Sequence, residues 1–432
     1  MASVTMMQGA LCQRAALQKP PPTGASAGGE GRAIPAMSGF CRGFAASDSA
    51  RLGMAMRQGA SRSRAALSVS ASKDAFQAKT AAVGDVVGSA MSNWDDIGFG
   101  VTKTSKMFVA TCDLNGEWTQ GELTDWKNLE LDPSSQVLNY GQSIFEGMKA
   151  SHSAKDRVVL FRPTENAARL EEGALRMSMP PVPRDLFVKA VKSVVAANFP
   201  WVPPHGKGSL YLRPLLMGTG PILGLGPAPS YTFLIYTSPV GSYFKGGQLV
   251  PIDLLVETRF HRAAPGGMGG TKAAGNYSPV LVTQLAAKKE GFADVLYLDA
   301  VENKYIEEVS SCNMFVVKGK NIATPPLGGT ILPGITRKSV IQIARDAGYT
   351  VEERPVSVDE LCEADEVFCT GTAVVVSPVG SVTYKGTKYQ FGEPGVVGPI
   401  GQQMYTKLTD LQFERSDDPY GWVVEVEGTE HL

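Results

Sequence analysis

Apolar and polar positions along residues 94–432 follow two patterns, one typical of short β-strands and the other of amphipathic α-helices. Short runs of apolar residues rich in β-branched and aromatic side chains predict strands. Longer stretches with an apolar residue at every third or fourth position predict helices. The predicted strands cover residues 157–161, 209–216, 231–236, 250–257 and 294–300, with a further pair around residues 318–321, and the predicted helices cover residues 163–177, 184–198, 278–291 and 339–348.

Local signals place the ends of these elements. The sequence Pro163-Thr164-Glu165 offers an N-cap and an acidic first turn for the helix of residues 163–177. A glycine-rich stretch at residues 241–249 separates two groups of elements and is interpreted as a linker. We therefore predict an α/β fold with mixed α+β sheets, built as a smaller domain of residues 94–240 and a larger domain of residues 250–432.

The first 73 residues differ in charge from the rest of the chain. They carry nine Lys or Arg residues and two acidic residues, a balance of +7, so the formal net charge of −1 leaves −8 for residues 74–432. A basic N-terminus rich in Ala, Ser and Arg, without a continuous apolar core, is typical of an organellar transit peptide. We interpret residues 1–75 as a transit peptide or disordered segment, directed to the chloroplast or another plastid, with the mitochondrion as the alternative.

Composition argues against several classes of partner. The acidic balance of residues 74–432 does not favour nucleic acid or an anionic membrane surface. No apolar run approaches the roughly 20 residues that a transmembrane helix needs. The six cysteines form no CxxC pair and the four histidines are well separated, so we expect neither a metal site nor a disulfide framework.

Lys272 lies in an unusual setting for a lysine. It follows a Pro265-Gly266-Gly267 turn and is surrounded by small residues, with Tyr277 five positions further on. A lysine in such a niche can lose its hydration, which lowers its pKa and frees the amine to attack a carbonyl. That chemistry is Schiff-base formation, and pyridoxal 5'-phosphate is the carbonyl carrier most often used for it. A structural lysine in a loop is the alternative.

A phosphorylated cofactor needs an anion site, and two segments offer one. Residues 333–339 lead from a turn into a helix, so the amides of Ile335 and Thr336 lie at its positive N-terminus. Residues 369–373 end a strand at Gly371 and leave backbone amides open to an anion. Either segment is equally compatible with an ordinary structural turn.

The adjacent acids Glu307 and Glu308 precede an apolar strand, and one of them is a candidate partner for a protonated pyridine nitrogen. Because neighbouring side chains of a strand point to opposite faces, we expect one acid to face inward and the other the solvent. Nucleotide-dependent chemistry has no motif here. The chain has no complete GxGxxG, and the glycines before Lys272 are not followed by the Gly-Lys-Ser/Thr of a phosphate-binding loop.

From about Trp94 to the C-terminus the chain resembles the branched-chain amino acid aminotransferases, and most closely their organellar plant forms. These are pyridoxal-phosphate enzymes of fold type IV. The resemblance rests on seven stretches: LNYGQSIFEGMKA, LFRPTENAARLEEGALRM, SLYLRPLLMG, GGTKAAGNYSPV, YIEEVSSCNMF, ILPGITRKS and FCTGTAVVVSPVGS. It implies two α/β domains joined by a short linker.

The resemblance also implies roles for individual residues around pyridoxal 5'-phosphate. Lys272 matches the Schiff-base lysine, Tyr277 the contact of the phenolic oxygen, and Glu308 the partner of the pyridine nitrogen. The implied phosphate ligands are Arg162, Ser311, Ile335, Thr336 and Thr372. The implied substrate pocket is an apolar wall with polar tips, made by Tyr140, Phe145, Tyr211, Arg213 and Tyr243, and the α-carboxylate is expected at Thr372 and Ala373.

The implied reaction is transamination between L-leucine, L-isoleucine or L-valine and 2-oxoglutarate, by a homodimer acting on small-molecule substrates. Alternatives are a D-amino acid aminotransferase, an aminodeoxychorismate-lyase-like enzyme, or a catalytically silent binding protein of the same fold. Some animal members carry a redox-sensitive CxxC where this chain has Val374 and Ser377, so that switch is expected to be absent.

Overall fold

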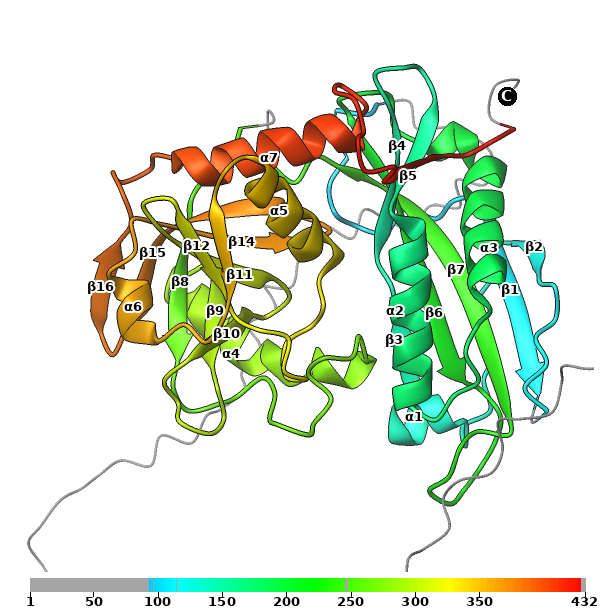
Figure 1. Cartoon of the computed structure of the whole chain (residues 1–432). Helices are drawn as coiled ribbons and strands as arrows, with labels where there is room; N and C mark the ends of the chain where they lie inside the picture. Colours follow the sequence, from blue (N-terminus) through cyan, green and yellow to red (C-terminus); the bar gives the residue numbers. More distant parts are fainter. Residues whose placement is uncertain (1–92, 96, 114, 245–247, 429–432) are drawn as a thin grey trace, which may run out of the picture. The chain divides into compact units, whose positions relative to one another are not determined.

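Two β-sheets with helices packed against them make up the described part of the chain (Figure 1). The first sheet has the strand order β17-β5-β4-β6-β7-β1-β2, with β3 paired to β6, and all its neighbours are antiparallel. Its strands are β1 (Lys106–Asp113), β2 (Glu122–Asp125), β3 (Ser143–Phe145), β4 (Met148–His152), β5 (Val158–Phe161), β6 (Gly208–Gly218), β7 (Ser230–Gly241) and β17 (Val423–Glu425).

The second sheet has the order β10-β9-β8-β15-β14-β11-β12-β13, with β16 paired to β15. It is mixed, because β8 runs parallel to both β9 and β15, and β12 runs parallel to β13. Its strands are β8 (Ile252–Glu257), β9 (Asp294–Leu298), β10 (Ile306–Val309), β11 (Asn313–Lys318), β12 (Asn321–Thr324), β13 (Thr350–Glu353), β14 (Glu366–Gly371), β15 (Val375–Tyr384) and β16 (Thr387–Gln390).

The computed structural model describes residues 93–95, 97–113, 115–244 and 248–428, which all fall within the unit of residues 77–432. The predicted transit peptide lies outside the described residues, as do residues 245–247 of the predicted linker. The strand β7 continues to Gly241, so the first residue of the predicted linker belongs to the sheet. The division into domains of residues 94–240 and 250–432 stays a prediction. None of the helices in the described residues is long and apolar enough to cross a membrane.

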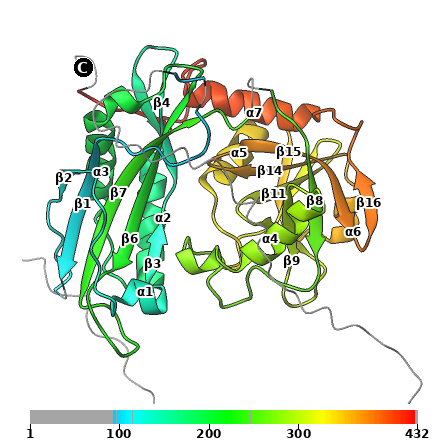
Figure 2. The same cartoon turned by 180° about the vertical axis from the view of Figure 1, so that it is seen from behind.

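Seven α-helices pack on these sheets within the described residues. They are α1 (Gln136–Tyr140), α2 (Pro163–Arg176), α3 (Arg184–Ala197), α4 (Val280–Lys289), α5 (Ile335–Asp346), α6 (Val358–Cys362) and α7 (Pro399–Gln412). Figure 2 shows α2 and α3 beside the strands of the first sheet, where α3 contacts β1 and β7. Buried Phe187, Val191 and Val194 recur along one face of α3, as the apolar spacing of its sequence predicts.

The predicted helices and strands of the described residues are confirmed in position, with one correction. The helix of residues 163–177 is α2, but Thr164 does not cap it. Its N-cap is Arg162, held in the left-handed region at φ 50°, and Pro163 occupies the first helical position. Proline is favoured there because its ring fixes a helical φ and that position needs no amide donor. The acidic first turn is supplied by Glu165, as predicted.

Both faces of the central strands of the second sheet are buried, which explains the almost continuous burial along β11 and β14. In β11, Phe315 and Val317 face a cluster shared with α5 and α7, whereas Met314 and Val316 face a second cluster that includes α6. Phe315 stacks on Phe368 of β14 with ring centroids 4.9 Å apart. This alternation fixes α5 against one face of the sheet and therefore fixes where its N-terminus points.

The stacked pair gives a prediction about stability. The substitution Phe368→Ala removes a fully buried ring between the sheet and α7, and we expect it to lower the free energy of unfolding by about 3–5 kcal/mol. Urea denaturation monitored by circular dichroism measures this difference. The matched control Val301→Ala alters a side chain that is 73% exposed and should change stability by less than about 0.5 kcal/mol. Equal losses in both variants would contradict the packing argument.

Candidate active site

Lys272 lies in an irregular segment between β8 and a short 3-10 turn at Ala274–Asn276. The segment is fixed by its own backbone: Gly270 N–H donates to Gly329 O at 2.7 Å, and Phe145 N–H donates to Lys272 O at 3.1 Å. A Cβ at Gly269 would lie 2.2 Å from Thr330 O, so the close approach of these two chain segments requires glycine. The glycines before Lys272 therefore allow its segment to pack against residues 329–330.

Aromatic and basic side chains gather around the Lys272 amine. Its Nζ donates to Tyr277 Oη at 3.2 Å and lies 4.7 Å from the ring centroid of Phe145. The Phe145 and Tyr277 rings are in edge contact at 5.0 Å. The Arg213 guanidinium lies 4.8 Å from the Phe145 ring and donates to Tyr211 Oη at 3.2 Å. The structure thus brings five sequence-predicted residues into one group.

Burial changes the ionisation of this group. Loss of hydration, with the nearby positive charge of Arg169, lowers the pKa of Lys272 from 10.5 to about 8. Burial likewise raises the pKa of Tyr277 to about 12, so its hydroxyl stays protonated at neutral pH. A substantial fraction of Lys272 is then a neutral amine near pH 8, which is the nucleophilic and basic form. Lys272 also lines a hollow that it shares with Arg169 and Gly329.

Glu308 lies in β10 and is 1% exposed. One of its carboxylate oxygens accepts a hydrogen bond from the backbone N–H of Leu332. The carbonyl of Leu332 in turn accepts from Asn313 Nδ2 at 3.0 Å, so Leu332 is held from both sides immediately before the Pro333-Gly334 turn. Burial raises the pKa of Glu308 to about 7, against the opposing effects of Arg262 and the Leu332 amide. Glu308 therefore anchors the chain that leads into α5.

The expectation that only one of the adjacent acids faces inward is wrong. Glu307 is also buried, at 7% exposure, because the strand is covered on both faces. Neighbouring side chains still point to opposite sides, but neither side is open water here. Burial raises the pKa of Glu307, and its Oε2 has no hydrogen-bond partner among the described residues.

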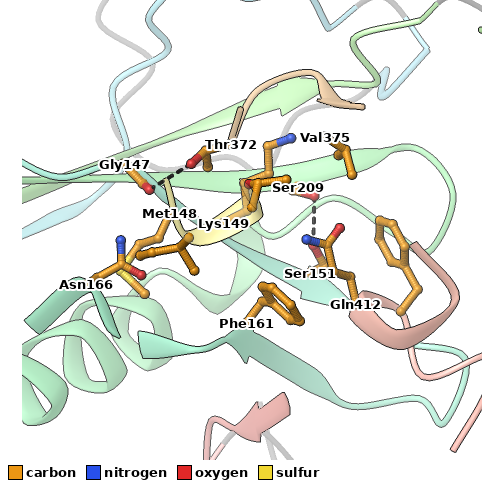
Figure 3. A pocket seen from close by; sticks show the side chains of 13 residues that line it. Gly147, Met148, Lys149, Ser151, Phe161, Asn166, Ser209, Thr372, Val375 and Gln412 are labelled. Atoms are coloured by element: carbon orange, nitrogen blue, oxygen red, sulfur yellow. Dashed lines mark hydrogen bonds between the residues drawn. The ribbon is translucent and has the colours of Figure 1, made fainter. Parts of the chain in front are cut away.

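The N-terminus of α5 opens on a cavity whose wall includes Gly147, Lys149, Ile335, Thr336 and Thr372 (Figure 3). The helix begins at Ile335 with Gly334 as N-cap and no side-chain cap, so no side chain of the cap satisfies its first amides. A Cβ at position 334 would lie 2.0 Å from Asn313 Oδ1, which excludes a capping side chain there. The helix dipole and these amides favour an anion in this cavity.

The hairpin between β14 and β15 closes the same cavity. Thr372 Oγ1 donates to Gly147 O at 3.4 Å, as Figure 3 shows. Val375 ends the hairpin loop at φ 59°, a left-handed conformation that is strained for a β-branched residue and costs about 1–3 kcal/mol. Residues in such conformations concentrate at functional sites because the surrounding structure must hold them there.

A second cavity adjoins the first and shares Lys149, Ser209 and Val375 with it. Tyr243 and Ala373 line this second cavity. Lys149 Nζ donates to Ala373 O at 2.9 Å, and burial lowers the pKa of Lys149 to about 8. Thus the hairpin turn of Thr372 and Ala373 is tied to the first sheet by two polar contacts.

Three other predicted residues lie outside these groupings. The Arg162 guanidinium donates to Ser339 Oγ of α5 at 2.8 Å and pairs with Glu165 at 3.0 Å. Ser311 is exposed beside Cys312, and Tyr140 is 47% exposed at the end of α1, where its hydroxyl donates to Leu223 O at 3.0 Å. The roles assigned to them stay predictions.

Sequence reasoning missed a buried ion pair next to the Lys272 segment. Glu146 is fully buried and accepts two hydrogen bonds from Arg169, at 2.8 and 2.7 Å. Arg169 also donates to Pro333 O at 3.0 Å, so this pair reaches from the end of β3 through α2 to the start of α5. The sequence did indicate buried charges here, since Glu146 and Lys149 lie within the otherwise apolar stretch SIFEGMKA. The residue that each charge meets was not readable from that stretch.

Comparison with known proteins adds independent evidence. A family model described as amino-transferase class IV matches residues 143–382. The chain is 56% identical over 342 residues to branched-chain-amino-acid aminotransferase 5, chloroplastic, of Arabidopsis thaliana, covering 79% of this chain and 82% of that protein. It is 52% identical over 335 residues to the mitochondrial branched-chain amino acid aminotransferase 1 of Humulus lupulus, covering 78% and 84%.

Solved structures of aminotransferases also resemble this chain. The crystal structure of the Escherichia coli branched-chain amino acid aminotransferase matches with a TM-score of 0.65 at 31% identity, over 75% of this chain and all of that one. A T.th. branched-chain amino acid aminotransferase complexed with N-(5'-phosphopyridoxyl)-L-glutamate matches with a TM-score of 0.64 at 28% identity, over 75% and 99%. This chain therefore covers both solved proteins almost completely.

The lowered pKa of Lys272 gives a prediction for the ligand-free protein. Keeping a protonated Lys272 amine in this interior opposes folding. This free-energy cost is fully present below pH 8 and disappears as the pH rises toward 10.5. Lys272→Met should therefore raise the unfolding free energy at pH 7, by at most about 3 kcal/mol, and flatten the gain in stability between pH 8 and 10. Thermal unfolding across this pH range measures both effects. The exposed control Lys289→Met should keep the wild-type slope, and an unchanged slope in Lys272→Met would contradict the assignment.

Proposed function

The chain belongs to the class IV aminotransferases of fold type IV, and we propose that it transfers the amino group between L-leucine, L-isoleucine or L-valine and 2-oxoglutarate. The observation that carries this proposal is the half-buried Lys272 amine, which lies beside Tyr277 and Phe145 and close enough to Glu308 to affect its ionisation. A binding protein would have no need to keep a partly neutral lysine close to a buried carboxylate.

Pyridoxal 5'-phosphate is the cofactor of this family, and the residues present fit it. Its phosphate would lie at the uncapped N-terminus of α5, where Ile335 and Thr336 face Thr372 across the cavity. The ring would be held between Lys272, Tyr277 and Glu308, with Glu308 on the ring nitrogen. Arg162 and Ser311 are proposed as further phosphate ligands. Two buried nitrogens without partners among the described residues, Nε of Arg213 and Nη1 of Arg262, support a polar ligand in this interior.

When bound, the cofactor supplies an aldehyde that takes up the amino group and a ring that withdraws electrons from the substrate Cα. The chain's own residues then move protons. Lys272, with its pKa near 8, would take the proton from the substrate Cα and hold it until it is returned. Tyr277 remains a hydrogen-bond donor throughout the neutral range because its pKa is about 12. Glu308 favours a protonated ring nitrogen by its negative charge.

The substrate side chain would occupy the space bounded by Phe145, Tyr211 and Arg213, with Tyr243 on the neighbouring cavity. Aromatic faces suit an aliphatic chain, whereas the Arg213 guanidinium and the Tyr211 hydroxyl suit the γ-carboxylate of glutamate. One pocket can then accept both substrates, since the polar groups sit on long side chains that withdraw from an apolar one. The α-carboxylate would bind at the amides of Thr372 and Ala373.

We further propose a homodimer in the chloroplast. Tyr140 is predicted to line a substrate pocket, yet it is 47% exposed on α1, and its hydroxyl donates to the carbonyl of Leu223, whose side chain is 90% exposed. An apolar surface of this kind, carrying a predicted pocket residue, suits an interface at which Tyr140 meets the site of a second copy.

The chloroplastic name of the Arabidopsis relative supports the plastid as the destination of this chain, and the mitochondrion is the alternative.

The proposed reaction is tested by absorption spectroscopy. The protein loaded with pyridoxal 5'-phosphate should show a visible band that is lost with L-leucine and returns with 2-oxoglutarate, while Lys272→Ala should lose turnover by more than about a thousandfold. The exposed Lys289→Ala variant is the matched control and should behave as wild type. A band that responds only to D-amino acids would favour the D-amino acid aminotransferase alternative. Absence of a band after incubation with the cofactor would overturn the enzyme assignment.

The dual use of the pocket is tested by Arg213→Gln. Loss of a charged hydrogen bond to the γ-carboxylate should raise the KM for 2-oxoglutarate about tenfold, with a change of less than about threefold for leucine. Steady-state kinetics with each substrate varied in turn measures the two values. Arg184→Gln, whose side chain is 59% exposed, should leave both unchanged. Equal increases for the two substrates would show that Arg213 supports the pocket rather than selecting glutamate.

A further inference from the structure

Arg262 is buried beside Glu308, and neither its chemistry nor its position is accounted for by the roles described above. Its Nη2 lies 3.5 Å from Glu308 Oε2, and the exposed fraction of both side chains is 2%. The guanidinium also lies 5.9 Å from the Tyr277 ring centroid. Arg262 therefore contacts two of the three residues proposed to hold the cofactor ring.

The hydrogen bonds of Arg262 leave much of its charge free. Nε donates to the carbonyl of Ser310 over a long 3.4 Å, and Nη1 is buried with no partner among the described residues. A buried guanidinium is costly unless its charge is balanced, and here the balancing anion is Glu308. Burying a cation with so few hydrogen bonds is hard to explain as packing alone.

Glu308 needs such a partner because most of its surroundings favour the neutral acid. Burial opposes its negative charge, and the adjacent carboxyl of Glu307 opposes it further. The charge of Lys272 favours the carboxylate less than that of Arg262 does. Arg337 is already engaged with Pro325 O at 2.9 Å and Glu353 at 3.0 Å. The ionisable groups close enough to interact electrostatically with Glu308 are Arg262, Glu307, Lys272, Tyr277 and Arg337.

We propose that Arg262 is a positioning residue that keeps the Glu308 carboxylate charged, and thereby able to hold a protonated pyridine nitrogen. The inference rests on the proposed function and deepens it, because it concerns the residue that enables Glu308 rather than Glu308 itself. Arg262 acts through the carboxylate and takes no proton in the reaction. The same cation also favours the charged form of Glu307 on the other side of the strand, where burial raises the pKa of that carboxyl.

The test compares Arg262→Met with the conservative Arg262→Lys and with the matched control Arg259→Met. Arg259 lies three residues away, has a side chain that is 66% exposed, and pairs with Glu257. Its substitution therefore removes one positive charge, as Arg262→Met does, but outside the proposed site. The first readout is the dissociation constant of pyridoxal 5'-phosphate between pH 6 and 9, measured by titrating the apoenzyme. The second is the pH profile of kcat/KM for leucine in the loaded enzyme.

Removal of the cation lets Glu308 protonate at a higher pH. In Arg262→Met we expect cofactor affinity at pH 7 to fall about tenfold and the acid limb of both profiles to move up by about one pH unit or more. Arg262→Lys should restore most of the affinity, and Arg259→Met should match wild type. Wild-type profiles in Arg262→Met, or an equal loss at every pH in the methionine and lysine variants, would overturn the proposal.

Two further outcomes are informative. If Arg262→Met does not fold, the double variant with Glu308→Gln is made. Recovered folding supports the ion pair, because a neutral amide then replaces the unpaired carboxylate. Continued failure to fold contradicts it. A wild-type protein that binds the cofactor but does not transaminate leucine overturns the proposed function alone. The pH dependence of cofactor affinity would still decide the role of Arg262.

Discussion

The site depends on keeping charged groups out of water. Burial lowers the pKa of Lys272 to about 8 and raises that of Glu308 to about 7, so a base and an acid approach each other in proton affinity within one interior. Such shifts oppose folding and persist only where the surrounding structure compensates for them. The charge of Glu146 opposes the shift of Lys272, and the charge of Arg262 opposes that of Glu308. The rest of the fold holds these groups in place.

Both sheets contribute side chains to the proposed site. The first supplies Phe145, Tyr211, Arg213 and Lys149 from β3, β6 and β4, and the second supplies Glu308 and the hairpin of Thr372 from β10 and β14. Their contact is polar as well as apolar, since Lys149 donates to Ala373 and Arg169 donates to Pro333. The backbone of Leu332, held by Glu308 and Asn313, then fixes the chain that enters α5. The proposed partner of the ring nitrogen and the predicted phosphate site are in this way built from one connected segment.

The strain at Val375 and the close contact at Gly269 show how narrowly this arrangement is specified. A β-branched residue in the left-handed region and a position where no Cβ fits both occur in segments bordering the proposed site. Packing between the sheet and α5 and α7, through residues such as Phe315 and Phe368, supplies stability elsewhere that can offset such strain. Stability and local strain are thus distributed over different parts of the same molecule.

The sequence alone determined four of the helices (α2, α3, α4 and α5) and the strands with the longest apolar runs. Periods of two and of about 3.6 residues predicted the strands and helices, because the core imposes them directly on the order of apolar residues. Lys272 was also detectable, since a charge among small residues is locally unusual. Only the tertiary structure revealed that Glu307 is buried as well as Glu308, that Arg162 occupies the N-cap of α2, and that Arg262 and Arg169 pair with Glu308 and Glu146. These facts depend on contacts between segments far apart in the chain, and no local pattern records which charge will meet which.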